Sequence, residues 1–344
     1  MNSSTPAHSS PRRSPEDLVR LGQELLQDRH ASVIERLPED LREVARHHFG
    51  IGPGGGWVPG QGRTPRFRLA ISVLLCTTID GSEWGHGAGA AVAANLTAAQ
   101  VGIHDNIMDA DFTRYGRPTA WRVFGRDKAL LAGNVLLALA FECLTRHAYA
   151  RRDEMILALA EVTRVCAAGQ CADVRLTEGP VTEAENLAVI NMKTAVPLGL
   201  LCRVGALASS ATARQVDAIE ALGRELGTMM QLNNDLEDLW AINGKEPSYS
   251  DLRARKYTYP ITSALRAGGA DKEPVAAYLR GTASASENEL AELAVVVERC
   301  GGRARTELMI RTTAAQALRH LRQADLPARP HADFEGFVGL IQRY

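Results

Sequence analysis

The stretch that decides the fold reads His104-Asp105-Asn106-Ile107-Met108-Asp109-Ala110-Asp111 and lies inside a long run of small and apolar residues. That run has the composition and spacing of a helix. Asp105 and Asp109 are four residues apart, so both carboxylates would leave the same face of the helix, one turn apart. Two like charges held that close repel each other unless a divalent cation or an arginine lies between them. The pair is therefore a candidate metal site.

A second oxygen-rich cluster has a similar internal spacing and reads Gln231-Leu232-Asn233-Asn234-Asp235-Leu236-Glu237-Asp238. Two helical clusters of this kind, facing each other, would hold Mg2+, which prefers oxygen ligands. In proteins Mg2+ is usually bound together with the phosphates of a substrate. The two clusters together predict a site for Mg2+ and a phosphorylated substrate.

The composition excludes several classes of protein. The chain has 344 residues, 45% of them hydrophobic, which is enough for two domains or for one unusually large helical domain. A formal net charge of −1 indicates neither a nucleic-acid binder nor a membrane-surface binder. The six cysteines show no CxxC or zinc-like spacing, and with no signal peptide we expect a cytoplasmic protein. No uninterrupted apolar run reaches the ~18 residues of a membrane span, so we expect none.

The organisation along the chain favours helices throughout. Residues 1–14 are rich in Ser, Pro and Arg, which predicts a disordered tail. Ser14 followed by Pro15 then has the pattern of a helix start, and residues 15–344 are expected to form a single all-helical domain. A glycine-rich stretch at 50–62 predicts a flexible connector. Helical periodicity is clearest in five segments: 127–147, 153–170, 183–207, 212–240 and 302–322.

Further motifs follow one order along the chain, around the two acidic clusters. They are Gly62-Arg63-Thr64-Pro65-Arg66, Arg114-Tyr115-Gly116-Arg117-Pro118-Thr119, Leu131-Ala132-Gly133-Asn134-Val135-Leu136-Leu137, Gly169-Gln170, Lys193-Thr194, Gly244-Lys245 and Asp251-Leu252-Arg253-Ala254-Arg255-Lys256. Together they make a sequence that resembles the trans-isoprenyl diphosphate synthase (polyprenyl synthetase) family. The resemblance implies an all-α fold, in which one large helix bundle surrounds a deep central cavity (the isoprenoid synthase fold), and usually a homodimer.

The resemblance also implies an activity, the Mg2+-dependent ionisation of an allylic prenyl diphosphate, with about three Mg2+ ions bound beside the diphosphate. The implied metal ligands are Asp105, Asn106, Asp109, Asn234, Asp235 and Asp238. The implied ligands of substrate diphosphates are Arg63, Arg66, Arg114, Lys193, Lys245 and Lys256. Those implied to be catalytic are Asp105, Asp109, Arg114, Lys193 and Lys245, and those implied to line the cavity are Gln100, Val101, Gln170 and Gln231. Cations aimed at the diphosphate oxygens would neutralise the charge that develops as it leaves.

The chain departs from the family pattern in two groups of residues. Asn106 and Asn234 stand where the family has aspartates, which lowers the negative charge and should weaken metal binding without diphosphate. Ala98 and Tyr115 stand where the family has ligands of isopentenyl diphosphate, the homoallylic partner, whose other ligands correspond to Arg63 and Arg66. Each lost charge-assisted bond costs roughly 1.5–3 kcal/mol, so the acceptor site would weaken by roughly two to four orders of magnitude.

This asymmetry leaves three functions to weigh. An enzyme that keeps ionisation and loses its acceptor would rearrange one chain, so the sequence favours a terpene synthase acting on a C15 or C20 diphosphate. The first alternative is an elongating prenyltransferase that condenses the allylic diphosphate with isopentenyl diphosphate. The second is a non-catalytic partner subunit of an elongase.

Overall fold

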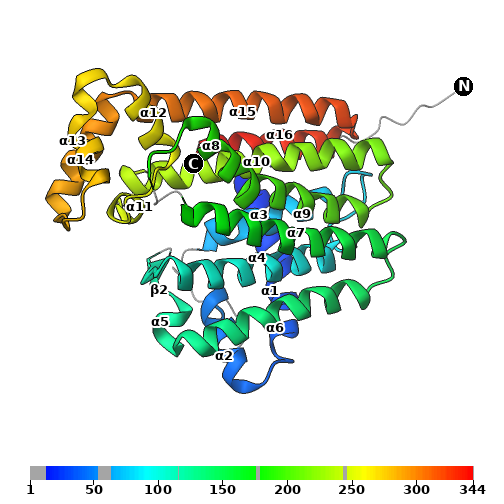
Figure 1. Ribbon diagram of the computed structural model, residues 1–344. Coiled ribbons are helices and arrows are strands. Elements are labelled where there is room, and N and C mark those ends of the chain that lie inside the picture. Colours follow the sequence, from blue (N-terminus) through cyan, green and yellow to red (C-terminus); the bar gives the residue numbers. More distant parts are fainter. Residues whose placement is uncertain (1–12, 53–62, 115, 176–178, 243–245, 344) are drawn as a thin grey trace, which may run out of the picture.

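The computed structural model describes residues 13–52, 63–114, 116–175, 179–242 and 246–343, with side chains of 63–68 excepted. Within these residues it is all-helical apart from one short two-stranded ladder (Figure 1), which confirms the predicted fold class. The elements are α1 (Pro15–Ile34), α2 (Glu39–Phe49), α3 (Arg63–Cys76), α4 (Ala88–Met108), β1 (Thr113–Arg114), β2 (Arg117–Pro118), α5 (Ala120–Phe124), α6 (Arg126–Thr145), α7 (Arg152–Val174), α8 (Glu183–Ile190), η2 (Asn191–Ala195), α9 (Val196–Leu207), α10 (Ala213–Leu239), α11 (Ser250–Arg253), α12 (Tyr259–Ala267), η3 (Gly269–Lys272), α13 (Glu273–Arg280), α14 (Glu287–Arg299), α15 (Gly302–Ala324) and α16 (Ala328–Gln342).

Helix α4 is at the centre of the bundle because its side chains are small. Its N-terminal turns, from Ala88 to Thr97, are buried throughout and consist largely of Ala and Gly, which let neighbouring helices approach closely. It packs mainly against α6 and α3, while α9 lies between α7 and α10 (Figure 1), and α15 covers the other side of α10. Helices α12, α13 and α14 form a separate layer at one end of the bundle (Figure 1). The first acidic cluster therefore ends a helix that most of the core surrounds.

The predicted helix start at Ser14 is confirmed, since the Asp17 amide donates to Ser14 Oγ at 3.0 Å. All five periodic segments are helical, although 183–207 is divided into α8, the π-helical turn η2 and α9. Pro197 has no amide hydrogen to donate to the Lys193 carbonyl four residues earlier, which explains why regular α-helix fails at this point. The glycine-rich connector falls mostly on 53–62 and the predicted tail on 1–12, and both lie outside the described residues.

Two glycines hold η2 in place. A Cβ on Gly169 of α7 would lie 2.7 Å from the backbone of Lys193, and one on Gly227 of α10 would lie 2.7 Å from Ala195 Cα. Only glycine allows backbones to pass this closely. The lysine of η2 is thus fixed between two helices, and π-turns of this kind are frequent at functional sites.

The sequence predicts no membrane span because no uninterrupted apolar run is long enough, but helix length and mean hydropathy give a different picture. Three segments are long and apolar enough to cross a bilayer: Arg126–Thr145, Arg152–Val174 and Glu183–Leu207. Between 44% and 56% of these apolar windows is buried inside the bundle. Helices that pack against neighbours on several sides are apolar on several sides, which a count of uninterrupted apolar residues does not detect.

Candidate active site

The first acidic cluster occupies the last turn of α4. Asp105 and Asn106 are buried, and Asp109 is the residue that ends the helix, its amide donating to the Asp105 carbonyl at 2.8 Å. Burial raises the pKa of Asp105, and the nearby charges of Lys193 and Arg114 oppose that rise. The two carboxylates leave one end of the helix, as their spacing predicts.

The side-chain amide oxygen of Asn106 accepts a hydrogen bond from another residue of the site. Arg114 Nη1 donates to Asn106 Oδ1 at 3.0 Å. Arg114 comes from β1, and the register of the ladder pairs it with Arg117 of β2. A neutral carbonyl holds this guanidinium without cancelling its charge. The structure thus gives Asn106, an implied metal ligand, a second task in placing Arg114 on the cavity wall.

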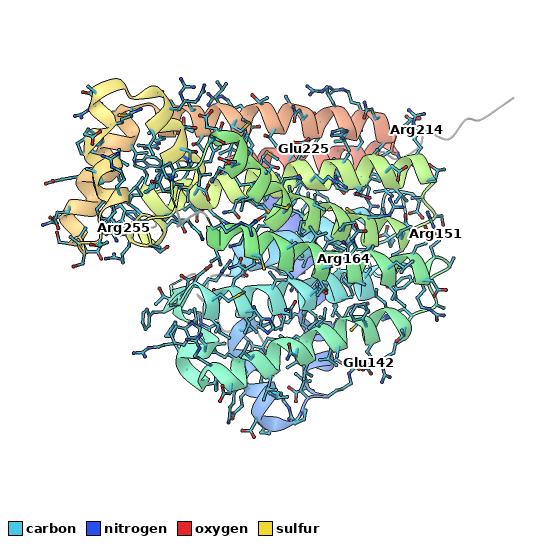
Figure 2. All side chains as sticks on the ribbon, in the orientation of Figure 1. Glu142, Arg151, Arg164, Arg214, Glu225 and Arg255 are labelled. Atoms are coloured by element: carbon cyan, nitrogen blue, oxygen red, sulfur yellow. The ribbon has the colours of Figure 1, made fainter. Side chains whose placement is uncertain are left out.

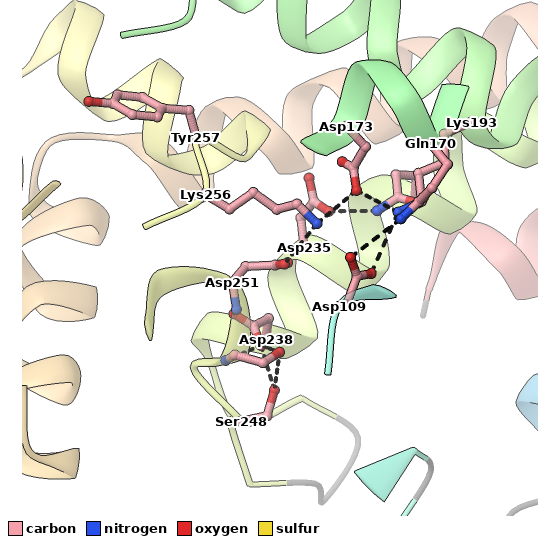
Figure 3. A network of polar contacts seen from close by, with 12 residues as sticks. Asp109, Gln170, Asp173, Lys193, Asp235, Asp238, Ser248, Asp251, Lys256 and Tyr257 are labelled. Carbon is pink, nitrogen blue, oxygen red and sulfur yellow. Dashed lines mark hydrogen bonds and ion pairs between the residues drawn. The ribbon is translucent and has the colours of Figure 1, made fainter. Parts of the chain in front are cut away.

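A carboxylate that the sequence reasoning missed, Asp173 of α7, lies between two lysines (Figure 3). Lys193 Nζ is 2.6 Å from Asp173 Oδ2, and Lys256 Nζ is 2.8 Å from the same atom. Burial opposes ionisation, but both lysines hold the pKa of Asp173 below its ordinary value. Its spacing of three residues from Gln170 on one helix was the signal that could have revealed it.

The same lysines face the first acidic cluster. Lys193 Nζ is 4.0 Å from Asp109 Oδ2, and Gln170 Nε2 donates to Asp109 Oδ1 at 3.3 Å (Figure 3). Burial lowers the pKa of Lys256, but the negative charges of Asp251, Asp173 and Asp109 raise it by more, so the net shift is upward. The proximity of these carboxylates therefore favours the charged form of Lys256, next to the cavity-lining Lys193.

The second acidic cluster contributes a buried carboxyl group from α10. Gln231 Nε2 donates to Asp235 Oδ1 at 2.9 Å, and Gln231 Oε1 accepts from Thr194 Oγ1 at 2.9 Å. Burial, with the charge of Asp251, raises the pKa of Asp235 to about 8. Asn234, one residue earlier, is exposed and lines the cavity.

Asp238 anchors the loop that leads to Lys256. The amide and hydroxyl of Ser250 both donate to Asp238 Oδ1 at 2.8 Å, Ser248 Oγ donates to the same oxygen, and the Asp251 amide donates to Oδ2 at 3.2 Å. Helix α11, which follows this loop, carries Asp251, a residue to which the sequence alone assigns no role. Burial and the charge of Asp238 raise the pKa of Asp251 to about 7.

The cavity has a volume of about 310 Å³ and runs from the acidic clusters into the core. Its wall includes Asp105, Asn106, Asp109, Arg114, Lys193, Gln231 and Asn234 at the polar end and Phe49, Leu69, Val162, Leu198 and Leu201 in the apolar part. Val101 and Gln231 line it as predicted. Gln100 does not, because it is on the face of α4 toward α6, where its Nε2 lies 2.9 Å from His104 Nδ1. Gln170 contacts Asp109 and is likewise absent from the wall.

Three predicted ligands lie outside the described residues. They are Lys245 and the side chains of Arg63 and Arg66. The same holds for Tyr115, one of the departures from the family pattern.

The donor set suits Mg2+ that arrives with a diphosphate. Among the described side chains, no group of three or more His, Cys, Asp or Glu lies close enough to hold a metal ion. The two clusters instead face the cavity with separate carboxylate and amide oxygens, mainly those of Asp105, Asp109 and Asn234. Mg2+ commonly takes one or two carboxylates and completes its octahedron with water and substrate phosphates. The residues present fit that mode of binding.

An apolar cavity whose mouth combines carboxylates with fixed cations defines a class of protein that binds a hydrocarbon chain carrying an anionic head group. A family model described as polyprenyl synthetase matches residues 60–297. The chain therefore belongs to the polyprenyl synthetase, or trans-isoprenyl diphosphate synthase, family of enzymes.

Individual relatives agree with this assignment. A (2E,6E)-farnesyl diphosphate synthase of Mycobacterium tuberculosis is 32% identical over 331 residues, which cover 94% of this chain and 92% of that protein. The crystal structure of a polyprenyl synthetase from Streptomyces coelicolor superposes with a TM-score of 0.83 and 29% identity, covering 94% of this chain and 98% of that one. A polyprenyl synthase from Caulobacter crescentus, complexed with calcium and isoprenyl diphosphate, shares the fold at 21% identity and a TM-score of 0.81, covering 97% and 99%. The family uses divalent metal ions with diphosphate substrates.

Proposed function

We propose that this protein is a chain-elongating trans-prenyltransferase that condenses an allylic diphosphate with isopentenyl diphosphate in the presence of Mg2+. The observation that carries the proposal is the similarity to a farnesyl diphosphate synthase along 94% of the chain. The sequence alone favoured a terpene synthase, and the relatives favour what was then the alternative. The cavity of about 310 Å³ beneath the first acidic cluster offers space for a prenyl chain.

The charged residues at the mouth of the cavity would bind and activate the allylic diphosphate. Lys193, Lys256 and Arg114 supply fixed positive charge near Asp109, and they stabilise the anion as it leaves. Mg2+, when bound, would act as the Lewis acid that neutralises the same oxygens. In the ligand-free protein Asp173 forms ion pairs with both lysines, so the phosphates of the substrate would compete with this carboxylate for the two ammonium groups.

The apolar part of the cavity would hold the prenyl chain. Leu69, Val162, Leu198 and Leu201 line it, and they provide neither a nucleophile nor a hydrogen-bond donor that could intercept the cation. An apolar wall would also keep bulk water away from the reacting carbon of the intermediate. This arrangement protects an allylic cation until the acceptor double bond attacks it.

A terpene synthase remains the second candidate because of one position on the wall. Ala98 lines the cavity and has no polar side-chain atom to offer an acceptor diphosphate. Arg117, which is close in sequence to Tyr115, cannot easily replace the missing ligand, because its Nη1 already donates to the His47 carbonyl at 2.9 Å. A weakened acceptor site would leave the cation to react within its own chain.

One assay separates these functions. Purified protein with Mg2+ is given geranyl, farnesyl or geranylgeranyl diphosphate, each with and without isopentenyl diphosphate, and the diphosphates and hydrocarbons formed are both analysed. Longer diphosphates that appear only with isopentenyl diphosphate support elongation. Hydrocarbon or terpene alcohol formed without it overturns the proposal in favour of the second candidate.

One control variant and one further outcome complete the assay. Asp105→Asn keeps the volume of a cavity-lining side chain and removes its charge, so it should abolish turnover. No turnover by the unaltered protein under any condition would instead favour a non-catalytic partner subunit.

We propose a homodimer as the active form. Sedimentation velocity of the purified chain tests this, and a monomer would contradict the proposal.

A further inference from the structure

A buried amide side chain is part of the cavity wall among apolar residues. Asn95 of α4 lines the cavity although its side chain is only 5% exposed. It shares that wall with Leu69, Leu198 and Leu201. A buried amide in apolar surroundings is costly unless its hydrogen bonds are made, so its partners identify its role.

A buried histidine fixes the orientation of this amide. His30 Nδ1 lies 2.8 Å from the Leu26 carbonyl, which can only accept, so Nδ1 carries the hydrogen. Burial lowers the pKa of His30 to about 4, so the ring is neutral and Nε2 is an acceptor. Asn95 Nδ2, at 2.9 Å from Nε2, must then be the donor.

The amide oxygen consequently points away from His30. Among the described residues no donor reaches Asn95 Oδ1, and this atom is not among the sealed, unpartnered polar atoms of the interior. Because the side chain lines the cavity, we infer that the oxygen is presented to the cavity space. A water molecule there would satisfy it, whereas a hydrocarbon would not.

The place of Asn95 along the cavity decides what it does to a prenyl chain. It precedes Asp105 by ten residues on one helix, which corresponds to about 15 Å along the axis. Each isoprene unit adds four carbon–carbon bonds of about 1.5 Å, or roughly 5 Å of extended chain. A chain whose diphosphate lies at the first acidic cluster therefore brings its third unit to Asn95 and its fourth unit past it.

We propose that Asn95, oriented by His30, is a specificity-determining residue that holds a water molecule in the cavity and disfavours chains longer than three isoprene units. The inference rests on the proposed function insofar as the cavity binds prenyl diphosphates. A fourth unit displaces the water and leaves the carbonyl oxygen facing hydrocarbon. Loss of a partner by a buried acceptor weakens binding on the order of tenfold, equivalent to about 1.4 kcal/mol.

Calorimetric titration with unreactive thiolo analogues of geranyl, farnesyl and geranylgeranyl diphosphate, in Mg2+, tests this without turnover. The unaltered protein should bind the C15 analogue about tenfold more tightly than the C20 analogue. Asn95→Leu should remove that preference and leave C10 binding unchanged, since the shorter chain does not reach residue 95. His30→Leu, which frees the amide to rotate, should reduce the preference partly.

Gln100→Leu is the matched control, because it removes a partly buried amide from the same helix on the face away from the cavity. It should keep the C15 preference. A C15 to C20 ratio that Asn95→Leu leaves unchanged, with C10 binding intact, overturns the inference while the proposed function stands. If the analogues bind with the expected C15 preference but the protein shows no elongation activity, the proposed function alone is overturned.

Discussion

Replacing Asp173 with Asn should destabilise the ligand-free protein and at the same time strengthen its binding of diphosphate. Asp173 is the carboxylate shared by Lys193 Nζ at 2.6 Å and Lys256 Nζ at 2.8 Å, and only 8% of its side chain is exposed. Removal of one partner from a buried ion pair costs about 3–5 kcal/mol. Asp109 and Asp251 still face the lysines, so we expect the lower value, about 3 kcal/mol in the free energy of unfolding.

The effect on ligand binding has the opposite sign. Without Asp173 the two ammonium groups lose their shortest internal contact and become available to an external anion. Inorganic diphosphate should then bind the metal-free variant more tightly, on the order of tenfold at low salt. Urea denaturation measures the first effect and isothermal calorimetry the second.

The pH dependence follows from the direction of the pKa shift. The pKa of Asp173 is lowered in the folded state, so its contribution is present above the unfolded value of about 3.9 and is lost as pH falls through the lower folded value. The stability difference between wild type and variant should therefore be full at pH 7 and shrink toward pH 3.

A matched control is Asp217→Asn, since Asp217 pairs with Arg203 at 3.0 Å but is 70% exposed. An exposed pair contributes little to stability, and this one is away from the cavity, so neither quantity should change much. If Asp173→Asn leaves diphosphate binding unchanged or weakens it, Asp173 does not compete with the substrate, and the proposed exchange of carboxylate for phosphate is wrong.

Three further changes have defined outcomes. Asn106→Asp should pair with Arg114 and weaken metal-free diphosphate binding about three- to tenfold, while the added charge strengthens Mg2+ binding; calorimetry with each ligand alone checks both signs. The pKa of Asp235 is raised to about 8 in the folded protein, so its contribution to stability is full below the unfolded pKa and is lost as pH rises through 8. Asp235→Asn should therefore flatten the fall in the urea midpoint between pH 5 and pH 9. A pH profile that the substitution leaves unchanged would contradict this. Gly169→Ala would place a Cβ 2.7 Å from the backbone of Lys193, so we expect a loss of about 1–3 kcal/mol in thermal or urea unfolding together with a lower kcat, and a fully active, stable variant would show that α7 and η2 can separate freely.

The fold could be predicted from the sequence because its signals are local. The five periodic segments are helical, and the cap at Ser14 forms as its neighbours indicate. The exception is the π-turn at 191–195, which depends on Pro197 and on two glycines far away in sequence. A periodic pattern indicates the apolar faces of α8 and α9, but it does not indicate the backbone contacts that interrupt the helical hydrogen bonds between them.

The candidate site was only partly predictable, because spacing finds residues on one helix and not their partners on another. Asp105 and Asp109 share a face as their spacing requires. Asp173 was missed because its ion-pair partners are Lys193 of η2 and Lys256 after α11, which are far from it in sequence. Gln100 was placed in the wall wrongly, since the rotation of α4 is set by what packs on it, and α6 takes that face.

These missed partners also alter the argument about charge that favoured a terpene synthase. Asn106 and Asn234 remove two negative charges from the acidic clusters, but Asp173 and Asp251 bring carboxylates to the same region from other elements. A count of the motif residues alone therefore leaves out the carboxylate of Asp173, whose pKa the two lysines keep low. Since those carboxylates hold the lysines in the ligand-free protein, a diphosphate can replace one of them, and Mg2+ can take the carboxylate oxygens that the lysines release. Such an exchange favours joint arrival of metal and diphosphate, as elongation and cyclisation both require, so the substituted motifs argue for altered metal affinity and not for a change of reaction.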